Sequence, residues 1–142
     1  MVLAICLLVV IILGPVMATR TRKSKAIAAK AGIEYRGVEA HKSFRVNIEP
    51  DAVTDRIRSV VHSNGRFSRM EEGPIGLRVY VRGNFWTWGE VIEVRLMEDA
   101  EGTVAQASCR PRLKTTLFDY GQNGKDLALF IELVQKSLPA HK

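Results

Sequence analysis

Histidine and cysteine are the residues from which an active site or a metal site is most easily built, and here they are scattered. The histidines are His41, His62 and His141, and neither Cys6 nor Cys109 sits beside one of them. No CxxC, HExxH or glycine-rich phosphate-binding motif occurs, and Ser, Asp and His residues form no recognisable catalytic arrangement. We therefore expect no enzyme, no metal site and no cofactor.

Two tryptophans are the most informative side chains for binding. Trp86 and Trp88 lie two residues apart, so on a strand they share one face. We expect both to point inward, because the Phe and Thr that alternate with them would take the other face, and Thr tolerates water better. The alternative is an exposed contact for a partner, a lipid or an apolar ligand, with Arg110 and Arg112 near it in sequence. A solvated edge is the simpler interpretation of these arginines.

The chain begins with an apolar segment, residues 1–18, that carries no charged side chain. A membrane-spanning helix needs about 20 apolar residues, with a lower limit near 17, and residues 2–18 supply seventeen. The sequence therefore predicts a single transmembrane helix. Its predicted lipid-facing residues are Val2, Leu3, Ile5, Leu7, Leu8, Val9, Val10, Ile11, Ile12 and Leu13.

A cleaved signal peptide is the alternative interpretation of this segment, since Val16, Met17 and Ala18 resemble a cleavage site. Against it, no basic residue precedes the apolar core, and four basic residues follow it. These are Arg20, Arg22, Lys23 and Lys25. Because basic residues favour the cytoplasmic side, we expect the N-terminus outside and the rest of the chain in the cytoplasm.

The net charge of +6 is unevenly distributed. Residues 19–45 carry eight Lys or Arg and two Glu, whereas residues 46–142 carry thirteen charges of each sign. The basic segment suits anionic lipid headgroups; the alternative interpretation is a topology signal with no further role. No recognition motif for nucleic acid accompanies it, so we expect no nucleic-acid partner.

Hydrophobic periodicity after the basic segment predicts an α+β domain over residues 44–138, with residues 19–43 as a juxtamembrane linker. Helix formers at 25–31, followed by Gly32, indicate that the first helix continues into this linker. The domain should hold an antiparallel sheet of about five strands, in the order β-α-β-β-β-β-α, with its helices on one face. Strands are expected near 44–48, 66–71, 77–82, 85–96 and 103–110, and helices near 50–64 and 123–138.

Two apolar stripes should form the core of this domain. The helix expected near 50–64 presents Val53, Ile57, Val60 and Val61. The helix expected near 123–138 presents Leu127, Phe130, Ile131, Val134 and Leu138. Asn123 is expected to cap the last helix, with Asp126 three residues on.

The segment FWTWGEVIEVRL (85–96) and the later Asp119, Gly121 and Asn123, with Ser108 on the preceding strand, resemble a family of bacterial and plastid domains of unknown function. This chain departs from the family pattern in two places: Gly89-Glu90 stand where the family has paired acids, and the family's Cys-containing N-terminal motif is missing. The resemblance covers roughly residues 44–138 and implies a small α+β fold, with no established activity.

These features favour a non-catalytic, single-pass membrane protein that docks a small cytoplasmic domain onto a larger membrane assembly. Its expected partners are membrane lipids and other membrane proteins, and no small-molecule ligand is expected. The alternative is a domain that binds a lipid or an apolar ligand at the membrane surface, in a pocket lined by residues such as Trp86, Trp88, Val94 and Phe130.

Overall fold

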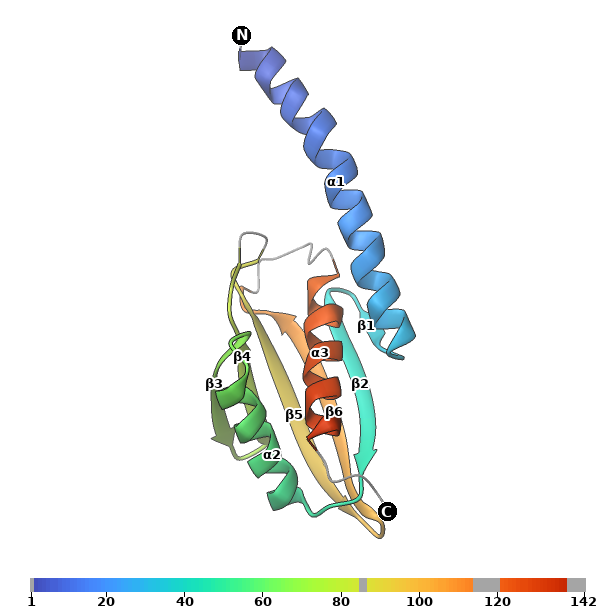
Figure 1. The fold of residues 1–142 in the computed structure, drawn as a ribbon, viewed down its shortest axis with the longest axis vertical. Helices are drawn as coiled ribbons and strands as arrows, with labels where there is room; N and C mark the ends of the chain where they lie inside the picture. Colours follow the sequence, from blue (N-terminus) through green and yellow to red (C-terminus); the bar gives the residue numbers. More distant parts are fainter. Residues whose placement is uncertain (1, 85–86, 114–120, 138–142) are drawn as a thin grey trace.

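The computed structural model describes residues 2–84, 87–113 and 121–137, and these form an α+β structure with a six-stranded antiparallel sheet (Figure 1). The strand order is β1-β2-β6-β5-β4-β3. The elements are α1 (Val2–Lys30), β1 (Glu34–Arg36), β2 (Glu39–Val46), α2 (Pro50–Ser63), β3 (Phe67–Gly73), β4 (Gly76–Val81), β5 (Glu90–Asp99), β6 (Gly102–Pro111) and α3 (Gln122–Lys136). The predicted α+β class and antiparallel sheet are confirmed, with one strand more than expected.

The additional strand, β1, is short and lies in the segment predicted as a linker. It pairs with β2, where Tyr35 is opposite Ala40. Strand β2 begins at Glu39, earlier than the predicted start at residue 44. Residues 19–43 therefore carry the second half of α1, all of β1 and the first part of β2. Three residues are too few to give a clear alternating pattern, which explains why the sequence did not predict β1.

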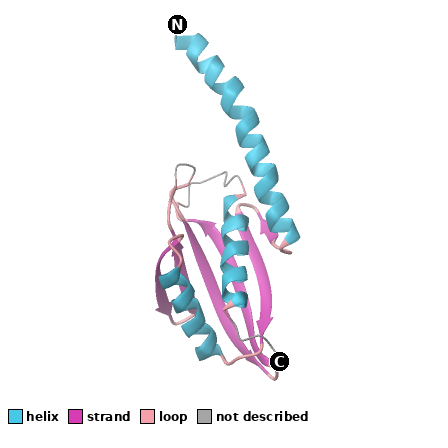
Figure 2. Cartoon of the chain, in the orientation of Figure 1, coloured by secondary structure: helices cyan, strands magenta, loops and turns pink. Residues whose placement is uncertain are grey.

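Helices α2 and α3 lie on the same face of the sheet (Figure 2), and the core fills the space between the two layers. The predicted stripe on α2 is buried throughout. On α3, the predicted stripe residues from Leu127 to Val134 are also buried, while Leu138 lies outside the described residues. Phe67 of β3 and Phe130 of α3 meet edge to face with ring centroids 5.8 Å apart, a geometry that aromatic pairs prefer.

Helix α1 is a single helix of 29 residues. Its second half lies beside α3, whereas its first half extends beyond the domain (Figure 1). The helix ends just before Gly32, whose φ of +67° is a left-handed conformation that glycine adopts without strain. The expected continuation of the first helix into the basic segment is confirmed.

A membrane-spanning helix was predicted for residues 1–18. Among the residues that the structure describes, no helix combines the length and the apolar character needed to cross a membrane. The transmembrane part of the prediction is thus unsupported by the fold.

Candidate functional site

Helix α1 meets α3 along a seam of small residues. Ser24 and Ala28, one turn apart on α1, are both buried, and they face Gly121 and Gly124 at the start of α3. A Cβ atom added to Gly124 would lie 2.8 Å from the Cβ of Ala28, and one added to Gly121 would lie 2.9 Å from the Cβ of Ser24. Larger residues would therefore push the two helices apart.

Tyr35 of β1 fastens the start of α3 from the other side. Its hydroxyl accepts a hydrogen bond from the backbone N–H of Gly124 at 3.0 Å and donates one to the carbonyl oxygen of Gly121 at 3.3 Å. The first N–H groups of a helix have no partner within the helix. The tyrosine thus satisfies one of these groups and joins β1 to the start of α3.

Next to this seam lies a buried charge cluster, formed by Arg66, Glu90, Gln122 and Asp126. The guanidinium of Arg66 donates to both carboxylate oxygens of Asp126, from Nε at 2.9 Å and from Nη2 at 2.7 Å. Gln122 donates from Nε2 to the same carboxylate at 2.9 Å. Because Asp126 is 2% exposed, its charge needs such partners to be tolerated. Hydrogen bonding to Asp126 raises the pKa of Arg66 above its ordinary value.

Glu90 is the least satisfied member of this cluster. It is 1% exposed, and its Oε2 lies 3.5 Å from Nη2 of Arg66. Its other oxygen, Oε1, has no hydrogen-bond partner within the described part of the chain. Burial, and next the negative charge of Asp126, raise the pKa of Glu90 to about 7. The cluster therefore holds a carboxyl group whose charge changes near neutral pH.

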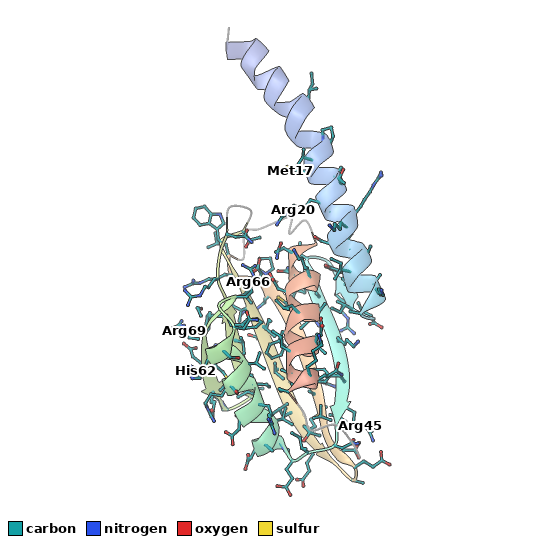
Figure 3. The ribbon with its side chains drawn as sticks, viewed as in Figure 1. Met17, Arg20, Arg45, His62, Arg66 and Arg69 are labelled. Atoms are coloured by element: carbon teal, nitrogen blue, oxygen red, sulfur yellow. The ribbon has the colours of Figure 1, made fainter. Side chains whose placement is uncertain are left out.

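The charge cluster is also connected to α1. Nη2 of Arg20 donates to Oε1 of Gln122 at 3.4 Å, and Gln122 in turn binds Asp126. Figure 3 shows Arg20 and Arg66 at the end of the domain from which α1 departs. A row of polar contacts thus runs from the helix to the sheet. Such an arrangement can fix the position of the helix relative to the sheet.

The inward orientation predicted for the tryptophans is wrong for Trp88, which is 78% exposed. Strand β5 begins only at Glu90. Gly89, with φ of +96°, and the isolated bridge between Asn84 and Thr87 interrupt the extended chain before it. The alternation of faces therefore does not reach back to Trp88. Trp86 lies outside the described residues.

The two predicted contact arginines are on the face of the sheet that carries no helix. Arg110 donates to Oε1 of Glu93 at 3.2 Å. Arg112 is exposed, and its guanidinium carbon lies 6.0 Å from the centre of the Tyr80 ring. Trp88 lies instead in the connection between β4 and β5. The structure thus separates the exposed tryptophan, at the loop end, from Arg110 within the sheet.

The predicted anchor residues all lie on α1. Among them the structure describes the side chain of Ile11, which is 62% exposed; Val16, further along the same helix, is 51% exposed. Of the predicted headgroup contacts, Arg22, Lys23 and Lys25 are exposed and Arg20 is partly buried. The exposed basic residues therefore lie directly after the exposed apolar ones.

The predicted capping role of Asn123 is wrong. The cap of α3 is Gly121, in a left-handed conformation with φ of 76° and no side-chain cap bond. Asn123 lies inside the first turn, fully buried, and its side-chain amide donates to the carbonyl of Val38. Asp126 points to Arg66 instead of stabilising the cap. Asp119 lies outside the described residues.

Sequence reasoning missed the charge cluster. Glu90 is two residues before Ile92 and four before Val94, so on a strand it lies on the same face as these two buried residues. This spacing alone could have placed Glu90 on the inward face of the sheet. Arg66 and Asp126 carry no such signal, since they are 60 positions apart in sequence.

No model of a known protein family matches the chain, and no curated protein is similar to it. The resemblance to the family of unknown function stays a prediction.

Proposed function

We propose that the protein is a non-catalytic accessory protein, anchored in a membrane by the first half of α1, which docks its α+β domain onto a larger membrane assembly. The observation that carries this proposal is the division of α1 into two halves. One half packs against α3, and the other extends from the domain with exposed apolar side chains such as Ile11 and Val16. Exposed apolar surface of this kind needs a lipid or protein environment.

The height of the domain above the membrane follows from the same helix. If residues 2–18 lie in the bilayer, Ser24 is six residues beyond its boundary, or about 9 Å at 1.5 Å per residue. The exposed Arg22, Lys23 and Lys25 would then lie at headgroup level, where each basic residue contributes about 1 kcal/mol to binding an anionic surface. The basic flank again favours the cytoplasm for the domain.

A domain fixed in this way is suited to presenting a surface. The small-residue seam, Tyr35 and the contact between Arg20 and Gln122 all limit its movement relative to α1. A catalytic role has no comparable support, because the carboxylate of Asp126 in the charge cluster is bound to Arg66 and Gln122.

The alternative function, binding of a lipid or apolar ligand, requires Trp88, Val94 and Phe130 to line one pocket. Val94 and Phe130 are buried in the core, with 1% and 0% exposure, while Trp88 projects from the loop end. This separation favours the docking function over the apolar pocket.

Extraction of the full chain from its native membrane in a mild non-ionic detergent, followed by size analysis, tests the docking function. We expect a complex much larger than the 15.9 kDa chain and its micelle. If charged contacts hold the complex together, this protein should stay in the complex at low salt and dissociate from it at high salt. A chain that migrates as a monomer at every salt and detergent concentration would contradict the proposal.

A further inference from the structure

The charges of the folded domain are unevenly distributed over its surface, although residues 46–142 have no net charge. On the helix side, α2 and α3 together carry four acidic and four basic residues, and the basic second half of α1 lies beside α3. The sheet face that carries no helix is called the open face below. Strand alternation and register place five arginines and four glutamates on it, and Arg112, which follows β6, lies near Tyr80 of the same face. The residues within the strands are Arg36, Arg69, Arg78, Arg95 and Arg110, with Glu34, Glu39, Glu71 and Glu93.

Contacts between these side chains confirm that they share one face. Glu93 of β5 lies 3.3 Å from Arg78 of β4 and 3.2 Å from Arg110 of β6. The guanidinium of Arg69 lies over the ring of Tyr80, at 4.2 Å from its centre. Arg45, at the far end of β2, is excluded from the set because Asp99 and Glu101 neutralise it.

Three arginines of the open face make no ion pair within the described residues, namely Arg36, Arg95 and Arg112. Their charge is therefore available to a partner. The one glutamate at the centre of the face, Glu93, is shared by two arginines and repels an incoming anion only weakly.

Two of these arginines line a cavity of about 590 Å³ over β1, β2, β6 and β5. Its hydrogen-bonding side chains come mainly from two neighbouring cross-strand rows. One row runs Glu93, Ser108, His41 and Glu34. The row on one side of it runs Arg95, Gln106 and Ser43, and Arg36, opposite Glu39, lies on its other side. A cavity of this volume is in the range of ligand sites. Its lining suits carboxylates, which arginine binds in a two-pronged geometry and which hydroxyl and amide groups can also bind.

We propose that the open face binds an extended acidic segment of a partner protein, with carboxylates of that segment seated in the cavity between Arg36 and Arg95. This inference rests on the docking function proposed above and names the surface and the chemistry of the partner. The excess of arginines over glutamates on the open face, with Arg36 and Arg95 at the cavity unpaired among the described residues, is the argument for an acidic occupant. The adjacent Tyr80, already in contact with Arg69, can pack against the segment where it leaves the cavity.

The test is a fluorescence-anisotropy titration of a labelled octaglutamate peptide with the full chain in a non-ionic detergent. We expect binding at low salt that weakens as salt is added. The double variant Arg36→Ala/Arg95→Ala should weaken binding about tenfold, since two exposed ion pairs are lost. The matched control Arg56→Ala/Lys125→Ala removes the same charge from exposed positions on α2 and α3, and should leave binding unchanged.

Three results would overturn the proposal. The first is no binding of octaglutamate at low salt, and the second is an equal loss in both double variants, which would make the binding a matter of net charge alone. The third is tighter binding of an eight-nucleotide oligothymidine that depends on Arg36 and Arg95, which would assign the face to nucleic acid. The membrane extraction described above is independent of all three results, so failure here leaves the membrane-anchor proposal standing.

Discussion

Replacement of Glu90 by Gln should remove a large part of the pH dependence of stability. The pKa of Glu90 is raised from 4.5 to about 7 in the folded protein by burial and by Asp126. A folded-state pKa above the unfolded value means that the folded protein holds the proton more tightly. The resulting stabilisation is complete below about pH 4.5 and is lost as the pH rises through 7.

The size of this effect follows from the shift. One pKa unit corresponds to about 1.36 kcal/mol, so a shift from 4.5 to about 7 corresponds to about 3 kcal/mol over the full range. Between pH 5 and pH 8 the protein should lose about 2–3 kcal/mol of its free energy of unfolding through this group. That is a substantial part of the roughly 5–15 kcal/mol that stabilises a typical domain.

Urea unfolding of the full chain in detergent, followed by circular dichroism at pH 5, 6, 7 and 8, measures this loss. Glu90→Gln is neutral at every pH, so its unfolding free energy should fall much less over this range. Glu93→Gln is the matched control, because it removes a glutamate from the same strand but on the open face, and it should retain the parent profile. If Glu90→Gln loses as much free energy as the parent between pH 5 and pH 8, the reasoning about the charge cluster is refuted.

Two further substitutions test the ends of the domain. Trp88→Ala should change the free energy of unfolding by less than about 0.5 kcal/mol, because the side chain is 78% exposed; a loss of about 3 kcal/mol in urea unfolding would show that it is packed. Tyr35→Phe should cost about 1–3 kcal/mol, because it leaves the Gly124 N–H without its partner. Tyr80→Phe is its control, since that hydroxyl binds exposed Glu71; equal losses in the two variants would contradict the role of Tyr35.

The layers of the fold could be predicted from local pattern alone. Val53, Ile57 and Val60 repeat with the helical period, and Pro50 begins the helix that carries them, so α2 was placed within a residue. Helix and strand periods depend only on near neighbours in sequence, which explains this success.

The candidate site could not be predicted in the same way. Arg66, Glu90 and Asp126 come together only when β3, β5 and α3 have packed, and charged residues seldom indicate burial in a sequence. The error at Trp88 has a local cause, since one positive φ at Gly89 ended the strand that was assumed to continue. The excess of arginines on the open face was hidden by the zero net charge of residues 46–142 and needed the strand register to appear.

The measurement that tests the central claim most directly is alkaline extraction of membranes from cells that express the full chain. The account predicts that the protein stays in the membrane pellet. Ile11→Arg should move it to the supernatant, because an arginine in the middle of a spanning segment costs about 2.5–3.5 kcal/mol. Ile75→Arg changes an exposed apolar position of the domain and should leave the protein in the membrane pellet. Release of the unmodified protein by alkali, or equal behaviour of the two variants, would contradict a membrane anchor in the first half of α1.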